Sequence, residues 1–78
     1  MRAYEYEMVK EGTIVKIKER SGGINGGKRG VVIYKEDRWM LIKAINPDNK
    51  NNWFKTKGTS DGRPLLLTSY AECDLDDF

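Results

Sequence analysis

The residues best suited to chemistry in this chain are cations beside a run of glycines. The stretch Gly22–Gly30 holds five glycines and the adjacent cations Lys28 and Arg29. Cations in a loop can neutralise phosphates, and glycine N–H groups can approach an anion closely. The stretch therefore indicates a contact surface for a polyanion. The same glycines are equally typical of a tight turn, because glycine tolerates backbone angles closed to other residues.

Further cations and two tryptophans are predicted to lie around this loop. Tryptophan rings stack on unpaired bases at about 1–3 kcal/mol per base, so a nucleic acid, RNA or DNA, is one predicted partner. A larger protein complex is the alternative, because exposed tryptophans are enriched among the residues that dominate protein interfaces. The residues do not decide between the two partners. The predicted contact residues are Lys16, Lys18, Arg20, Lys28, Arg29, Lys35, Arg38, Trp39, Lys43, Trp53 and Lys55.

The chain lacks the residues of common catalytic and metal sites. It has no histidine, so its single cysteine, Cys73, has no imidazole to activate it. The pattern Gly22-x-x-x-x-Gly27-Lys28 departs from a phosphate-binding P-loop at Arg29, where a Mg²⁺-binding serine or threonine belongs. The aspartates lack the spacing of a metal-binding loop. We expect a protein that is not an enzyme and that uses no cofactor and no metal.

Length and charge are those of a small basic domain. The chain has 78 residues, enough for one domain, and a net charge of +2. The last seven residues carry only acids among their charges, which leaves 14 bases against 8 acids, a net +6, in residues 1–71. A basic body with an acidic end suits a polyanion partner. It equally suits a soluble surface with a solvated tail.

Neither export nor membrane insertion is indicated. The N-terminal residues lack the apolar core of a signal peptide, and no apolar run approaches the ~20 residues that span a bilayer. A single cysteine excludes an internal disulfide. We therefore expect a cytoplasmic protein with no membrane partner, and the sequence leaves its oligomeric state open.

Short alternating runs predict a fold made of strands. In Thr13–Glu19, lysines alternate with β-branched residues, as in a strand with one buried face. Trp39–Ile45 is the strongest strand signal, and keeping Lys43 in solvent turns Trp39 and Leu41 outward with it. The predicted interior consists of Val15, Ile17, Val32, Met40, Ile42 and Phe54.

The remaining segments give weaker signals. Residues 1–10 alternate loosely, which predicts an extended arm or edge strand that precedes a domain spanning 11–78. By the solvation argument used above, Lys55 is expected to turn Trp53 outward. Composition predicts loops at Asn46–Asn52 and Lys57–Arg63.

Several short strands separated by turns are typical of a small barrel. The segments Gly12–Ile17 and Gly27–Val32 resemble the KOW motif of SH3-like barrels, in which a first strand and a loop precede a Gly-x-x-Gly-x-Val strand. The segment Leu67–Leu75 is also similar to these barrels, which often end in a strand, a 3₁₀ turn and a short last strand. Ser69 can cap that turn, with Glu72 three residues on. The resemblance implies an all-β, five-stranded SH3-like barrel with a glycine-rich loop and a short 3₁₀ turn before the last strand.

KOW-type barrels commonly bind RNA, ribosomes or transcription machinery. The resemblance therefore implies a ribonucleoprotein or transcription complex as partner, contacted through Gly23–Gly30 with Lys28 and Arg29 as the loop cations. Other SH3-like barrels bind proteins, and a fold alone does not define a function. A small accessory protein, or a viral inhibitor of a host factor, is the alternative.

Overall fold

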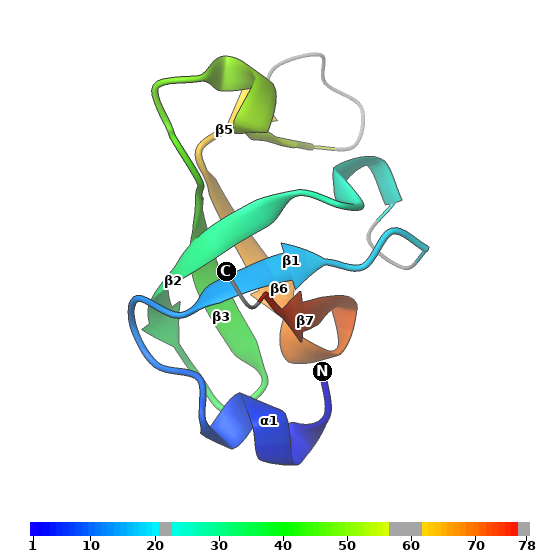
Figure 1. The fold of residues 1–78 in the computed structure, drawn as a ribbon, viewed down its shortest axis with the longest axis vertical. Helices are drawn as coiled ribbons and strands as arrows, with labels where there is room; N and C mark the ends of the chain where they lie inside the picture. Colours follow the sequence, from blue (N-terminus) through cyan, green and yellow to red (C-terminus); the bar gives the residue numbers. More distant parts are fainter. Residues whose placement is uncertain (21–22, 57–61, 77–78) are drawn as a thin grey trace.

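A computed structural model of the chain describes residues 1–20, 23–56 and 62–76. Within these ranges the chain forms short strands joined by tight turns, with one α-helix and three 3₁₀ turns (Figure 1). The elements in chain order are α1 (Ala3–Glu7), β1 (Ile14–Ile17), η1 (Gly23–Asn25), β2 (Arg29–Lys35), β3 (Trp39–Ala44), η2 (Lys50–Asn52), β4 (Phe54–Lys55), β5 (Gly62–Arg63), β6 (Leu65–Ser69), η3 (Tyr70–Glu72) and β7 (Cys73–Leu75).

Five strands form one antiparallel sheet in the order β6-β3-β2-β1-β7, and β4 and β5 form a separate two-stranded ladder. The strands β1, β2 and β3 follow one another as a meander, and the chain returns from β6 through η3 to place β7 beside β1 (Figure 1). The predicted all-β fold is confirmed. The sheet does not close on itself, because β6 and β7 are its two edges and do not pair with each other.

Strand β2 connects the two halves of this sheet. Its first residues pair with β1, from Arg29 opposite Lys16, and its later residues pair with β3. The register with β3 shifts between Val32 and Tyr34, which leaves Ile33 as an extra residue. Such a bulge bends a strand and increases its twist. The bend curves the sheet around its buried face.

The buried face of the curved sheet is the core, and it contains the residues that the sequence predicted. All six predicted interior residues are at most 2% exposed: Val15, Ile17, Val32, Met40, Ile42 and Phe54. Along β3, Met40 and Ile42 are buried, whereas Trp39 and Lys43 are exposed on the opposite face. Alternation therefore predicted the facing of the central strands correctly, because a strand turns successive side chains to opposite faces.

The N-terminal segment is a helix, so the prediction of an extended arm or edge strand was wrong. Tyr6 within this helix and Val9 just after it are buried together with Met1. The Tyr6 ring stacks on Tyr70 at 4.8 Å between centroids, and its hydroxyl donates to the Trp39 carbonyl at 2.8 Å. These contacts with distant residues hold α1 against the core.

The closing turn has the predicted form. Turn η3 follows β6, and the Ser69 hydroxyl accepts a hydrogen bond from the Ala71 N–H at 3.3 Å. The predicted loop Asn46–Asn52 contains the 3₁₀ turn η2 at its end. The other predicted loop, Lys57–Arg63, falls mostly on residues 57–61, which lie outside the described residues.

Candidate nucleic-acid interface

The glycine-rich loop is fixed to the rest of the fold through Asn25. The Asn25 Nδ2 donates to the Lys55 carbonyl at 2.8 Å, and the Lys55 N–H donates to the Asn25 Oδ1 at 2.7 Å. The Asn25 side chain thus pairs with the backbone of Lys55 in the way that a neighbouring strand would. Asn25 is only 7% exposed, and both bonds are partly buried. Asn25 therefore connects the turn η1 to strand β4.

Two glycines in this loop are required by local geometry. A Cβ added to Gly26 would lie 2.7 Å from the Glu19 carbonyl oxygen, closer than real contacts allow. Gly27 has a φ of +85°, in the left-handed region that favours glycine. Its N–H donates to the Ile17 carbonyl at 2.8 Å, which closes the base of the loop. The close approach of the loop to the end of β1 therefore explains these two glycines.

Lys28 does not project from the loop as the sequence predicted. Its Nζ donates to the Trp53 carbonyl, and the side chain is partly buried. Burial lowers the pKa of Lys28 below its usual value, and the neighbouring charge of Lys55 lowers it further. Trp53 is also held in place: its Nε1 donates to the Pro47 carbonyl at 2.7 Å, and its ring packs against the core. Both residues have a structural role.

Lys35 is likewise held inside the fold. Its Nζ donates to the Val9 carbonyl at 3.0 Å and to the Tyr6 carbonyl at 2.5 Å. The ammonium also lies 4.4 Å from the centre of the Tyr6 ring, a cation–π contact. Lys35 thus binds one carbonyl near the C-terminal end of α1, a favourable place for a cation, and one just beyond the helix. We therefore do not include it in the candidate interface.

The acidic end of the chain lies along the basic strand. Asp76 pairs with Arg29 at 2.5 Å, and Asp74 lies 4.0 Å from the Lys18 ammonium. Asp74 is also 3.4 Å from the amino group of Met1. In the sheet register, Lys16 has Arg29 on one side and Asp74 on the other. The acids that the sequence placed in a tail thus neutralise part of the predicted basic surface.

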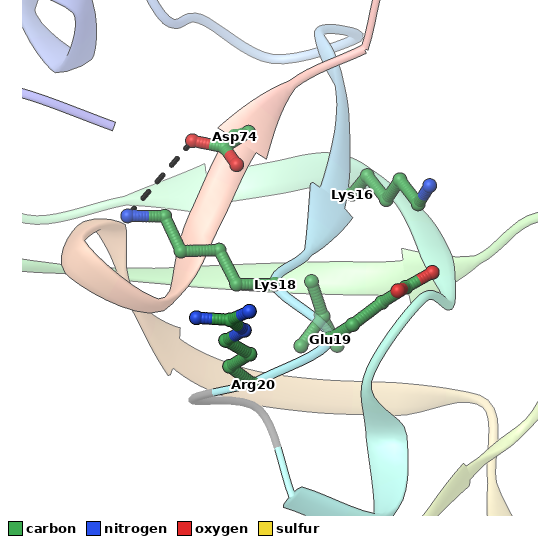
Figure 2. Close-up of a pocket in the computed structure, with 6 residues that line it drawn as sticks. Lys16, Lys18, Glu19, Arg20 and Asp74 are labelled. Atoms are coloured by element: carbon green, nitrogen blue, oxygen red, sulfur yellow. Dashed lines mark ion pairs between the residues drawn. The ribbon is translucent and has the colours of Figure 1, made fainter.

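The cations at the end of β1 surround a surface pocket of about 310 Å³. Figure 2 shows Lys18 and Arg20 extending toward the same side, with Lys18 directed at Asp74, while Lys16 and Glu19 point the other way. Three cations against two acids leave this surface basic. The lining residues are Lys16, Ile17, Lys18, Glu19, Arg20 and Asp74.

The other predicted residues are spread over the sheet. Lys43 lies on the outward face opposite Val31, and Lys55 is exposed beside the glycine-rich loop. Trp39 is 51% exposed and follows the exposed Arg38 at the start of β3. Because neighbouring strands run antiparallel, the start of β3 and the end of β1 lie at opposite ends of the sheet. The predicted surface is therefore divided in two.

The outward face of β2, β3 and β6 carries an apolar surface that the sequence reasoning described only in part. Across these strands Tyr34, Leu41 and Leu67 lie side by side in register. Leu67 is 62% exposed and Leu65 is 44% exposed. Successive side chains of a strand point to opposite faces, so Leu65 and Leu67 lie on the face opposite to that of Leu66. This two-residue period was the signal that could have identified the surface. We define the outer apolar patch as Tyr34, Trp39, Leu65 and Leu67.

Comparison with protein-family models, with curated proteins and with solved structures gives no match. Among the described residues, no group of three or more histidine, cysteine, aspartate or glutamate side chains could hold a metal ion. No helix in the described ranges is long and apolar enough to cross a membrane. The functional inference below therefore depends on the geometry of this chain alone.

Proposed function

We propose that this chain is a non-enzymatic binding module, an open relative of the SH3-like barrels, that binds nucleic acid through the cations at the end of β1. A glycine-rich loop between the first two strands and a 3₁₀ turn before the last strand support the relation to these barrels. A cytoplasmic location remains a prediction from the sequence.

The observation that carries the proposal is that Lys16, Lys18 and Arg20 line one surface pocket, with Lys18 and Arg20 extending toward the same side (Figure 2). Lysine and arginine bind the phosphate backbone, which positions a protein on nucleic acid without reading its sequence. Asp74 already places a carboxylate 4.0 Å from the Lys18 ammonium. A phosphate oxygen can occupy a similar position, so a nucleic acid would compete with Asp74 for Lys18.

The same geometry predicts weak and largely sequence-independent binding. Lys28 and Lys35 are engaged within the fold, so fewer cations contribute than the sequence predicted. Trp39 offers a stacking surface, but at the far end of the sheet from the pocket. We expect phosphate contacts at the end of β1 to dominate, with affinity that falls steeply as salt is added.

The test measures fluorescence anisotropy of a labelled single-stranded RNA, and of the matching DNA, between about 20 and 300 mM salt. The double variant Lys16→Glu, Lys18→Glu is expected to bind at least tenfold more weakly. Its slope of log K against log salt should fall by about 1.4, because each phosphate on a single strand contributes about 0.7.

The matched control is the double variant Arg2→Glu, Lys10→Glu, which changes the net charge equally on exposed residues away from the pocket. We expect it to retain most of the affinity. Equal losses in both variants would show a general charge effect and discard the pocket as the site. Affinity that does not change with salt would discard the nucleic-acid proposal.

A protein partner is the second candidate, and the exposed outer apolar patch is the observation that favours it. Exposed aromatic and aliphatic side chains on one face often mark interaction sites. A complex of this kind is expected to resist salt and to weaken on Trp39→Ala. Those two readouts, measured on the same complex, distinguish it from nucleic-acid binding.

A further inference from the structure

Strand β6 is an unprotected edge of the five-stranded sheet. It pairs with β3 over five residue pairs, and no strand in the described ranges pairs with its other side. Edge strands usually carry charges or are very short, which prevents pairing with other chains. The opposite edge, β7, is three residues long and carries Asp74. In contrast, β6 is Leu65-Leu66-Leu67-Thr68-Ser69 and has no charge.

Two hydrogen bonds define which backbone groups of β6 point toward β3. Just before β6, the Ala44 N–H donates to the Pro64 carbonyl at 2.7 Å. Just after β6, the Tyr70 N–H donates to the Arg38 carbonyl at 3.4 Å. Hydrogen-bonded and non-hydrogen-bonded pairs alternate along an antiparallel ladder. The even-numbered positions from 64 to 70 therefore bond to β3.

The odd-numbered positions of β6 then present their backbone groups to the uncovered side. These are Leu65, Leu67 and Ser69, each with one N–H and one C=O. Leu65 and Leu67 also have exposed side chains on the outward face. The edge thus combines three donors and three acceptors with two exposed leucines, in a strand without charge.

We propose that β6 pairs antiparallel with β6 of a second copy of this chain, about a two-fold axis at Leu67. In this arrangement Leu67 lies opposite Leu67 of the second copy, and Leu65 lies opposite Ser69 of the second copy. Every donor and acceptor on the two edges then has a partner. The two five-stranded sheets become one continuous antiparallel sheet.

A second copy fits this edge because the edge is self-complementary. An uncharged strand has no like-charge repulsion against its own copy, and a two-fold interface needs one patch that matches itself. The two Leu67 side chains meet across the axis as a cross-strand pair. Packing the outward faces against each other is less favourable, because it would bury the exposed Lys43.

The available area indicates a weak dimer. Pairing of the two edges buries only the uncovered side of the five-residue strand β6, together with part of the exposed Leu65 and Leu67 side chains. Stable interfaces bury about 800 Å² per partner, and a single pair of short edge strands falls below that value. We therefore expect a monomer–dimer equilibrium that responds to concentration in the micromolar range.

Sedimentation velocity of the full chain, from about 1 μM to 1 mM, tests the proposal. We expect the weight-average mass to rise from monomer toward dimer. Leu67→Lys should weaken dimerisation at least tenfold, because it places two ammonium groups opposite each other at the axis. Tyr34→Lys is the matched control: Tyr34 belongs to the patch but lies on β2, so the edge dimer should persist.

Ser69 supplies a second pair of variants that act on the backbone. Its φ of −81° is close to the value that proline requires, so Ser69→Pro removes an edge N–H at little cost in strain. Ser69→Ala controls for loss of the η3 cap and keeps that N–H. We expect Ser69→Pro to reduce dimerisation and Ser69→Ala to leave it intact.

Hydrogen exchange gives an independent readout. The amides of Leu65, Leu67 and Ser69 should become more protected as concentration rises, while those of Leu66 and Thr68 are protected throughout. A chain that stays monomeric at 1 mM would overturn the proposal. So would a dimer that survives both Leu67→Lys and Ser69→Pro, or one that is lost with Tyr34→Lys alone. None of these three outcomes affects the nucleic-acid proposal, which uses the opposite side of the sheet.

Discussion

The side chain of Asn25 allows a quantitative prediction, because this buried residue makes two partly buried hydrogen bonds to the backbone of Lys55. Asn25→Ala removes the bonds to the Lys55 N–H and C=O, at 2.7 and 2.8 Å. Each bond contributes about 0.5–1.5 kcal/mol, and a buried group left without a partner costs about 1–3 kcal/mol. We expect the free energy of unfolding to fall by about 2–3 kcal/mol.

The assay is urea unfolding followed by tryptophan fluorescence, since Trp53 packs against the core next to Lys55. For a domain of this size, the expected loss lowers the melting temperature by about 10–20 °C. The slope of free energy against urea should be unchanged. A change in that slope would indicate that the compactness of one state, rather than stability alone, has been altered.

Asn49→Ala is the matched control for this experiment. Asn49 also accepts a hydrogen bond from a backbone N–H, that of Asn51 at 3.0 Å, but it is exposed. We expect Asn49→Ala to cost about 1 kcal/mol or less, as for other capping residues. If Asn25→Ala costs no more than Asn49→Ala, the loop is not locked to β4 and the structural explanation of the glycine-rich segment fails.

Three further predictions concern single side chains. Burial, together with nearby Asp37, raises the pKa of Tyr6, so its contribution to stability is complete below pH 10 and is lost as pH rises through the higher folded pKa. Urea titrations between pH 8 and 11 should show a larger loss in the wild type than in Tyr6→Phe, which keeps the raised pKa of Tyr34 beside Glu36. Asp76→Asn removes the carboxylate that pairs with Arg29 and one negative charge from this surface, and it should strengthen RNA binding roughly threefold at low salt in the anisotropy assay; unchanged affinity would place this end of β2 outside the interface. Burial raises the pKa of Cys73, so a thiol reagent should modify it only as fast as the protein opens, and rapid native-state labelling would contradict its burial.

Patterns over a few neighbouring residues predicted the facing of the central strands and the turn before the last strand. Alternation of charged and apolar residues along β1 and β3 identified the buried residues, because a charged side chain on the wrong face is costly. The capping hydroxyl of Ser69 identified the turn η3. The all-β character followed from these signals, whereas the separate β4-β5 ladder, the N-terminal helix and the openness of the sheet did not. Closure of the sheet into a barrel depends on whether its two edge strands, β6 and β7, pair with each other.

The candidate site was harder to predict, because its cations are set by contacts between distant segments. No local pattern indicated that Lys28 would reach the Trp53 carbonyl or that Lys35 would bind the carbonyls of Tyr6 and Val9. It placed Asp76 in a tail, where the structure pairs it with Arg29. In each case a long side chain found a partner far away in the chain. Such pairings leave no periodic signal.

The pairing of β1 with β7 has a consequence for how this chain acquires its structure. The amino group of Met1 donates to the carbonyl of Cys73, 72 residues further along, and β1 lies between β2 and the last strand. Contacts between such remote segments require large loops to close, which slows folding. A nascent chain that has not yet released β7 from the ribosome therefore cannot complete the sheet. We expect a single cooperative transition in refolding experiments, in which α1 and β7 become ordered together.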